Sequence, residues 1–135
     1  LQRSLKRLAA HRRASGVDPA VVGFSMGGHW AVWLAQHPPP RVAATVLYYA
    51  ARAGDFTLAT SPLLAHFAGT DGFVRPAARR RMERAASLQG LTCRCHDYPG
   101  TTHWFAESDE PAYDAAAAGA ALDRTVSFLA DSQRG

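Results

Sequence analysis

Short apolar runs alternate along this chain with longer stretches in which apolar residues recur at helical spacing. Four runs are short enough to be strands: residues 20–24, 42–49, 63–67 and 91–98. Four stretches have helical character: residues 1–13, 26–37, 76–87 and 111–130. This order predicts an α/β fold with a mostly parallel sheet of about four strands and helices on both faces.

Turn-forming residues separate these elements. Pro38-Pro39-Pro40 ends the helical stretch that begins at Met26, because proline lacks the N–H that a helix interior needs. Pro76 stands at the favoured first position of the next helical stretch, and Gly90 follows its end. Residues 51–61 show no clear period, so we expect a loop there.

Three of the helical stretches show an apolar face at three- and four-residue spacing. Their predicted inward residues are Leu1, Leu5, Leu8 and Ala9 in the first stretch, Ala31, Leu34 and Ala35 in the second, and Leu122, Val126 and Leu129 in the last. The run 42–49 is almost continuously apolar, β-branched or aromatic, which is typical of a strand buried on both faces.

Composition bounds the organisation of the chain. The 135 residues are 47% hydrophobic and 19% charged, and no apolar run reaches the roughly 18 residues that suggest a membrane span. The first residues lack the pattern of a secretory signal peptide, so we predict a cytoplasmic protein. Because Leu1 already stands inside a helical pattern, we expect residues 1–135 to be a single, N-terminally incomplete domain.

Charge does not point to a nucleic-acid partner. The net charge of +4 comes from 14 arginines and one lysine against 11 acidic residues. Many of the arginines fall within residues 3–13 and 79–84, and neither stretch contains an aromatic residue that could stack on a base. We therefore interpret both stretches as solvated helix faces and predict no nucleic-acid partner.

The sequence also predicts neither a metal site nor a cofactor. Cys93 and Cys95 lack C-x-x-C spacing and share one face of a predicted strand, which disfavours a disulfide or a zinc site. Neither an H-x-H nor an H-E-x-x-H cluster is present. Reduced, structural cysteines are the simpler interpretation.

The most specific motif is Gly23-Phe24-Ser25-Met26-Gly27, a G-x-S-x-G sequence between a predicted strand and a predicted helix. In α/β-hydrolases this motif forms a sharp turn that exposes a nucleophilic serine above the sheet. We expect Gly23 and Gly27 to leave room for the close-packed backbone around Ser25. Met26 opens the helix, so its free N–H is placed to receive a developing oxyanion.

Two further residues complete a candidate catalytic triad. A serine nucleophile needs a base, and the base needs an acid that orients it. Asp71 follows the third predicted strand and His103 follows the fourth, so the chain order Ser, Asp, His is that of α/β-hydrolases. All three residues stand where parallel strands deliver their C-terminal ends, which is where ligands bind in open α/β sheets.

Other residues compete for these roles less well. Asp55 and Asp97 are the alternative acids, but Asp71 alone stands in a Gly-x-Asp turn just beyond a strand. His29 is expected to face away from the cleft or to line its wall, and His66, which alternates with apolar residues, is expected to be a packed core histidine. The remaining histidines have no partner pattern: His11, His37 and His96.

The motif segments together resemble the dienelactone hydrolase family. They are Gly23-Phe24-Ser25-Met26-Gly27-Gly28, His66-Phe67-Ala68-Gly69-Thr70-Asp71, Tyr98-Pro99-Gly100-Thr101-Thr102-His103-Trp104-Phe105, and the closing Tyr113, Ala116, Ala117 and Phe128-Leu129. The resemblance extends from about Val17 to Leu129. It implies that the chain is the C-terminal portion of an α/β-hydrolase fold.

The chain departs from the family pattern in three respects. The resemblance implies a cysteine nucleophile where this chain has Ser25, and an arginine for the substrate carboxylate where it has Glu107. A neutral or differently charged ester is therefore a better candidate substrate than a carboxylate-bearing dienelactone. Nothing before Gly23 resembles the loop that supplies the second oxyanion donor in whole members of the fold.

These observations predict a serine hydrolase of small carboxylic esters or lactones that acts through an acyl-enzyme. Trp104, Phe105, Tyr49 and Phe73 are candidate substrate-pocket walls. Two alternatives stay open: a truncated, catalytically poor module that serves in binding or assembly, and an acyltransferase with the same triad. An unpaired sheet edge before the serine would favour a homodimer.

Overall fold

The sheet and helices follow the predicted order along the chain. The computed structural model describes residues 2–38 and 41–133. Its elements are α1 (Gln2–Ser15), β1 (Val21–Phe24), α2 (Met26–Gln36), β2 (Thr45–Tyr48), β3 (Leu63–Ala68), α3 (Pro76–Leu88), β4 (Cys93–Tyr98) and α4 (Ala115–Ser132). The strands form one sheet in the order β1-β2-β3-β4, and every neighbouring pair is parallel. The predicted α/β fold is confirmed.

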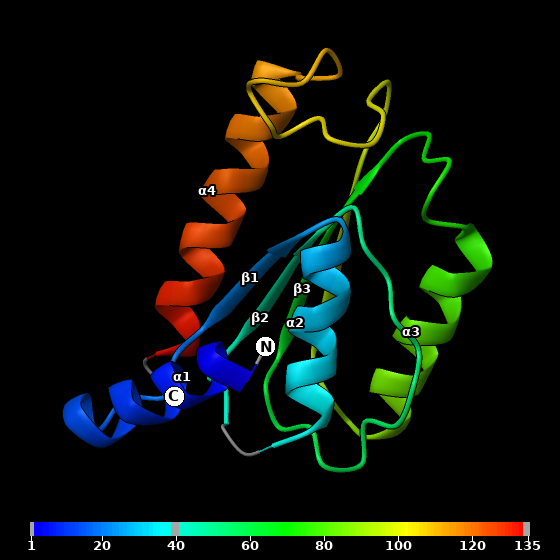
Figure 1. Cartoon of the computed structure of the whole chain (residues 1–135). Helices are drawn as coiled ribbons and strands as arrows, with labels where there is room; N and C mark the ends of the chain where they lie inside the picture. Colours follow the sequence, from blue (N-terminus) through cyan, green and yellow to red (C-terminus); the bar gives the residue numbers. More distant parts are fainter. Residues whose placement is uncertain (1, 39–40, 134–135) are drawn as a thin grey trace.

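Helices cover both faces of the sheet, with α2 and α3 on one face and α4 on the other (Figure 1). On the first face Val32 of α2 and Met82 of α3 are fully buried against strand residues such as Leu47. On the second face Phe128 of α4 packs with Val46 of β2. The sheet is therefore sandwiched between two apolar layers, as the sequence pattern predicts.

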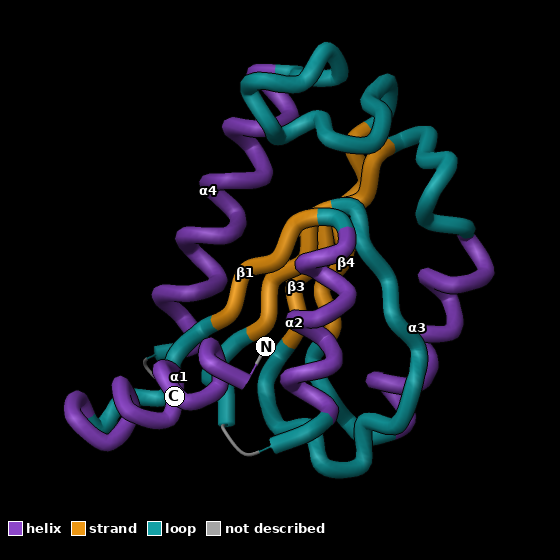
Figure 2. The backbone as a smooth tube through the Cα atoms, viewed as in Figure 1, coloured by secondary structure: helices purple, strands orange, loops and turns teal. Residues whose placement is uncertain are grey.

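The two central strands are buried at every position. β2 and β3 each have a strand on both sides and helices on both faces, so both surfaces of each strand are covered. β1 and β4 are the edges of the described sheet and bury their side chains only in part. Figure 2 shows the loops that follow the strands leaving the sheet at one end, which is the end that carries the candidate site.

The predicted inward face of α2 is correct, because Ala31, Leu34 and Ala35 are all buried. The first helix extends two residues beyond its predicted end, to Ser15. Its predicted apolar residues fall largely outside what the structure describes: Leu1, and the side chains of Leu5 and Leu8. No described helix is long and apolar enough to cross a membrane.

The predicted inward face of the last helix is correct for Leu129, which packs partly buried against the core, but wrong for Leu122 and Val126. Leu122 and Val126 are 57% and 59% exposed, whereas Ala121, Thr125 and Phe128 are buried. The helix also begins at Ala115 and not near residue 111, because Asp114 caps its first turn by accepting a hydrogen bond from the Ala117 N–H at 2.9 Å.

A buried polar network explains this rotation of α4. The Thr125 hydroxyl is hydrogen-bonded to Tyr48 Oη at 2.9 Å and to His66 Nε2 at 3.0 Å. His66 Nδ1 completes the network with Tyr98 Oη at 2.8 Å. Because these partners satisfy the hydroxyl, a polar residue faces the core where the spacing of leucine and valine predicted an apolar one. His66 is fully buried, so its prediction as a core histidine is confirmed.

Candidate active site

The candidate site lies at the C-terminal ends of the strands. Ser25 follows β1 directly, Asp71 stands three residues beyond β3, and His103 stands five residues beyond β4. Because all four strands are parallel, their ends deliver these residues to the same edge of the sheet.

Ser25 adopts the backbone conformation of a sharp turn between β1 and α2. Its φ of 50° lies in the left-handed region that favours glycine, and its ψ is −120°. The turn is held from both sides: the Ser25 N–H donates to the Tyr48 carbonyl at 2.9 Å, and the Ser25 carbonyl accepts from the Gly28 N–H at 3.0 Å. This geometry projects the hydroxyl away from the sheet, at the start of the helix.

Close backbone approach beneath the serine requires glycine at two positions. A Cβ on Gly23 would lie 2.4 Å from the Gly27 carbonyl oxygen, and one on Gly28 would lie 2.6 Å from Ala50 Cβ. A Cβ on Gly27 would meet nothing within 4 Å. The predicted need for glycine is therefore correct at Gly23 and wrong at Gly27, and Gly28 is the second position that leaves no room for a side chain.

A hydrogen-bonded chain connects the three predicted catalytic residues. Ser25 Oγ lies 2.8 Å from His103 Nε2, and His103 Nδ1 lies 2.8 Å from Asp71 Oδ2. The side chains of His103 and Asp71 are each only 6% exposed. Such a chain lets the imidazole accept the serine proton while the carboxylate fixes its tautomer and orientation.

Asp71 uses its other carboxylate oxygen to hold its own loop. Oδ1 accepts hydrogen bonds from the N–H groups of Phe73, at 2.8 Å, and Val74, at 3.0 Å. Since Oδ2 is left for His103, one carboxylate both shapes the turn after β3 and orients the imidazole.

The loops that carry the acid and the base are joined through their backbones. The Gly69 N–H donates to the Tyr98 carbonyl at 2.9 Å, and the Thr70 N–H donates to the Thr101 carbonyl at 3.0 Å. A Cβ on Gly69 would lie 2.9 Å from that Tyr98 oxygen, so glycine permits the approach. Asp71 and His103 are thereby placed together without a long flexible connection between them.

The two alternative acids have other partners. Asp55 accepts from the Thr57 N–H at 2.8 Å and from the Thr57 hydroxyl. Asp97 forms an ion pair with Arg79, which in turn pairs with Glu83. Neither carboxylate is directed at His103, whose Nδ1 is bonded to Asp71.

Aromatic rings surround the imidazole of His103. The rings of Phe73, Trp104 and Tyr49 have their centroids 4.7, 4.8 and 4.9 Å from it. Ser25, Tyr49 and Trp104 are the non-glycine residues with positive φ in the described part of the chain. Unfavourable backbone conformations thus gather around the candidate base, a pattern that is common at functional sites.

Three of the four predicted pocket residues line hollows beside the triad. Tyr49 and Phe73 line a hollow of about 160 Å³ that also contains Ser25 and His103. Phe73 and Trp104 line a second hollow, of about 420 Å³, which His103 also lines but Ser25 does not. Phe105 was predicted as a wall but is fully buried in the core beneath the loop, because its ring packs on Tyr49 and Tyr98.

Sequence reasoning did not predict the pairing of Tyr49 with Glu107. Tyr49 Oη donates to Glu107 Oε1 at 2.9 Å, so the residue that replaces the family arginine is engaged inside the loop that carries His103. Burial, and then the bond to Glu107, raise the pKa of the Tyr49 phenol, which keeps it a donor near neutral pH. No local sequence signal could have found this pair, because its members are 58 positions apart.

His29 lines the wall of the smaller hollow, which is one of its two predicted placements. Its Nε2 contacts the Arg52 guanidinium, whose Nε also donates to Gln36 Oε1 at 3.2 Å. Partial burial and, second, the Arg52 charge lower the pKa of His29, which favours the neutral ring. His29 is therefore a wall residue that can accept a hydrogen bond.

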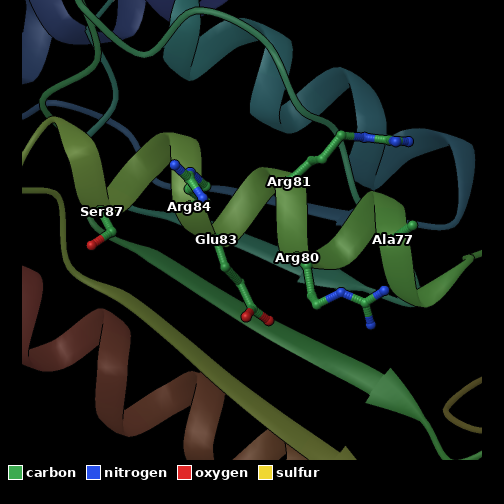
Figure 3. Close-up of a pocket in the computed structure, with 6 residues that line it drawn as sticks. All are labelled: Ala77, Arg80, Arg81, Glu83, Arg84 and Ser87. Carbon is green, nitrogen blue, oxygen red and sulfur yellow. The ribbon is translucent and has the colours of Figure 1, made fainter.

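A larger and shallower hollow, of about 660 Å³, lies along α3 (Figure 3), and none of the candidate triad residues lines it. It is lined by one helix alone, through Ala77, Arg80, Arg81, Glu83, Arg84 and Ser87. Figure 3 shows Arg80 and Arg81 leaving the helix in different directions. This arrangement agrees with a solvated, basic helix face and not with a built site.

The parallel sheet, the strained serine turn and the order Ser, Asp, His at the strand ends are the features of the α/β-hydrolase class. A model of the dienelactone hydrolase family matches residues 1–133, and the chain belongs to this family. No curated protein sequence matches the chain.

Solved structures share the fold at low sequence identity. A dienelactone hydrolase-like promiscuous phosphotriesterase from metagenomic libraries has a TM-score of 0.81 and 19% identity over 96% of this chain and 59% of its own. A thermophilic esterase from Thermogutta terrifontis has a TM-score of 0.75 and 17% identity over 95% of this chain and 61% of its own. A carboxylesterase from Lactobacillus plantarum has a TM-score of 0.71 and 17% identity over 95% of this chain and 64% of its own. The chain thus spans about three fifths of the length of these proteins.

Proposed function

We propose that this chain carries the catalytic residues of a serine hydrolase that acts on small carboxylic esters or lactones. The observation that supports the proposal most directly is the chain of two 2.8 Å hydrogen bonds from Ser25 through His103 to Asp71. Membership of the dienelactone hydrolase family and the fold shared with esterases support the same reaction class.

In the proposed mechanism Ser25 Oγ attacks the carbonyl carbon while His103 Nε2 takes its proton. The Met26 N–H donates to the oxyanion, since it opens α2 and has no carbonyl one helical turn earlier to bond. His103 then returns the proton to the leaving alcohol, and the acyl group stays on Ser25. Water, activated by the same imidazole, hydrolyses the acyl-enzyme and restores the serine.

Asp71 orients the imidazole and stabilises its cation, since its Oδ2 accepts from His103 Nδ1. The substrate in this proposal is not the carboxylate-bearing lactone for which the family arginine is suited. Glu107 occupies that position, and its Oε1 is bonded to the phenol of Tyr49. A carboxylate there repels an anionic substrate, so neutral esters are favoured.

The test combines covalent labelling with turnover. A fluorophosphonate should phosphonylate Ser25 Oγ with loss of fluoride. Ser25→Ala should abolish this label and lower ester turnover by about 10³-fold or more in kcat/KM. Asp71→Asn should lower kcat by about 10³–10⁴-fold, because an amide that donates to Nδ1 favours the wrong imidazole tautomer. Asp55→Asn is the matched control, since Asp55 holds only its own turn through Thr57.

The outcomes separate the proposal from its alternatives. Folded protein that neither labels at Ser25 nor hydrolyses an activated ester would support the binding or assembly module instead. Label with slow hydrolysis, but rapid formation of a new ester when an alcohol is added, would indicate an acyltransferase. Rapid hydrolysis with no transfer product supports the hydrolase.

A further inference from the structure

Two hollows of different size meet at the candidate base. The smaller, of about 160 Å³, contains Ser25 together with Met26, Ala51 and Val74. The larger, of about 420 Å³, is lined by Trp104, Glu110 and Ala112 and does not include the serine. Phe73 and His103 line both, so these two side chains form the boundary between the hollows.

The order of proton transfers assigns one part of an ester to each hollow. The acyl carbon bonds to Ser25 Oγ and its oxyanion faces the Met26 N–H, so the acyl group occupies the smaller hollow. The leaving oxygen takes its proton from His103 Nε2, so it lies beside the imidazole. Its substituent then extends past Phe73 into the larger hollow, which His103 also lines.

The volumes limit what each part can be. The smaller hollow, of about 160 Å³, has less than half the volume of the larger, of about 420 Å³, so it suits the smaller part of the ester. The larger hollow has room for an aromatic ring and is walled by the rings of Phe73 and Trp104, whose centroids are 5.4 Å apart. Such a pair offers both apolar area and ring stacking to an aryl group.

The charge of the larger hollow restricts which alcohols it can accept. Glu110 lines the larger hollow and supplies an acidic side chain among apolar and hydroxyl-bearing neighbours. A carboxylate on the alcohol would face this side chain at short range, where like charges repel. An uncharged or cationic alcohol meets no such penalty.

We propose that the preferred substrates are esters of a short acyl group with an aryl-bearing alcohol that carries no negative charge. This inference rests on the proposed esterase function. Ala112 and Val74 then set specificity, because each lines one hollow with a small side chain whose size can be changed.

Two matched ester series test the proposal on the full chain. With 4-nitrophenol as the constant leaving group, kcat/KM should fall by about tenfold or more from acetate to octanoate. With acetate as the constant acyl group, 2-phenylethyl acetate should exceed ethyl acetate by about tenfold or more, although their intrinsic reactivities are close. A 4-(carboxymethyl)benzyl ester should be turned over more slowly than its 4-methylbenzyl analogue.

Variants connect each preference to its hollow. Ala112→Leu should lower the ratio of 2-phenylethyl to ethyl acetate turnover, whereas Ala120→Leu, at an exposed position on α4 outside both linings, should not change it. Val74→Ala should reduce the difference in kcat/KM between 4-nitrophenyl acetate and 4-nitrophenyl octanoate. Glu110→Gln should narrow the gap between the carboxylated and the neutral benzyl esters.

The results distinguish failure of the inference from failure of the proposed function. Turnover that depends on Ser25 but favours octanoate, or ignores the phenyl group, overturns the inference and leaves the esterase proposal standing. Preferences that persist unchanged in Ala112→Leu and Val74→Ala overturn the assignment of the hollows. A chain that neither labels at Ser25 nor cleaves any of these esters contradicts both proposals.

Discussion

At the scale of single residues, the position of the Ser25 hydroxyl depends on a neighbouring glycine, Gly23, where there is no room for a side chain. The positive φ of Ser25 costs roughly 1–3 kcal/mol and persists only because its neighbours hold it. Bonds to Tyr48 and Gly28 hold the turn, and the absence of a Cβ at Gly23 lets the first turn of α2 pack on β1. The motif is therefore a packing requirement as well as a chemical one.

Gly23→Ala should destabilise the protein by about 1–3 kcal/mol, because its Cβ would lie 2.4 Å from the Gly27 oxygen, a backbone atom that cannot move independently. Gly27→Ala is the matched control: it meets nothing within 4 Å and should leave stability unchanged or raise it by up to about 1 kcal/mol. Urea unfolding of both variants measures the difference. Equal stabilities would contradict the proposed backbone contact.

At the scale of elements, α4 is oriented on the sheet by hydrogen bonds as well as by apolar packing. Thr125 on the helix joins Tyr48 of β2 and His66 of β3, and His66 joins Tyr98 of β4. One helix is thus connected to three adjacent strands through a buried polar network. Since each buried member has a partner, the network specifies the rotation of the helix at little cost.

His66 should make the fold sensitive to acid. Burial, and then the charges of His96 and Arg124, lower the pKa of His66 to about 3 in the folded protein, against 6.5 for the free side chain. The unfolded chain therefore binds a proton first, so stability is retained above pH 6.5 and is lost as the pH falls toward 3. The loss approaches about 1.4 kcal/mol per pH unit in that window.

The test replaces His66 with glutamine, which does not titrate in this range. Thermal or urea unfolding between pH 7 and pH 4 should show a shallower loss of stability for His66→Gln than for the wild type, whatever its stability at pH 7. His37→Gln, at an exposed position, is the control and should keep the wild-type slope. Parallel slopes for all three proteins would rule out His66 as the source of acid sensitivity.

At the scale of the whole molecule, apolar surface gathers beside the edge strand β1. Phe24 on β1 is 43% exposed, and Leu122 and Val126 on α4 are exposed by more than half. A groove of about 340 Å³ contains Phe24 and Leu122 together with Tyr113. Within the described sheet β1 is an edge strand, and an edge strand beside exposed apolar side chains favours association with another chain.

We therefore expect this chain to associate with itself in a concentration-dependent way. Leu122→Lys should shift the equilibrium toward the monomer, because a charge would be buried in the contact. Leu88→Lys, at a more exposed leucine on α3, is the control and should not shift it. Sedimentation or light scattering over a wide concentration range measures both, and a wild type that stays monomeric throughout would contradict the expectation.

The sequence alone determined the fold class, the chain order of the candidate triad and the family. The periodicity of apolar residues is a local property, so it identified each strand and helix of the described residues. The G-x-S-x-G motif placed Ser25 between β1 and α2. Parallel connectivity then required that Asp71 and His103 reach the same edge as Ser25. The fold class and the order of the candidate triad needed only short-range pattern and topology, whereas the family rested on the resemblance of the motif segments.

Only the tertiary structure decided which side chains are exposed and which touch. It turned Thr125 and not Leu122 into the core, because the partners of Thr125 lie on β2 and β3. It buried Phe105 and divided the space around His103 at Phe73. Such outcomes depend on contacts between residues far apart in the chain. The local pattern of apolar and polar positions does not show which distant residue will supply a hydrogen-bond or packing partner.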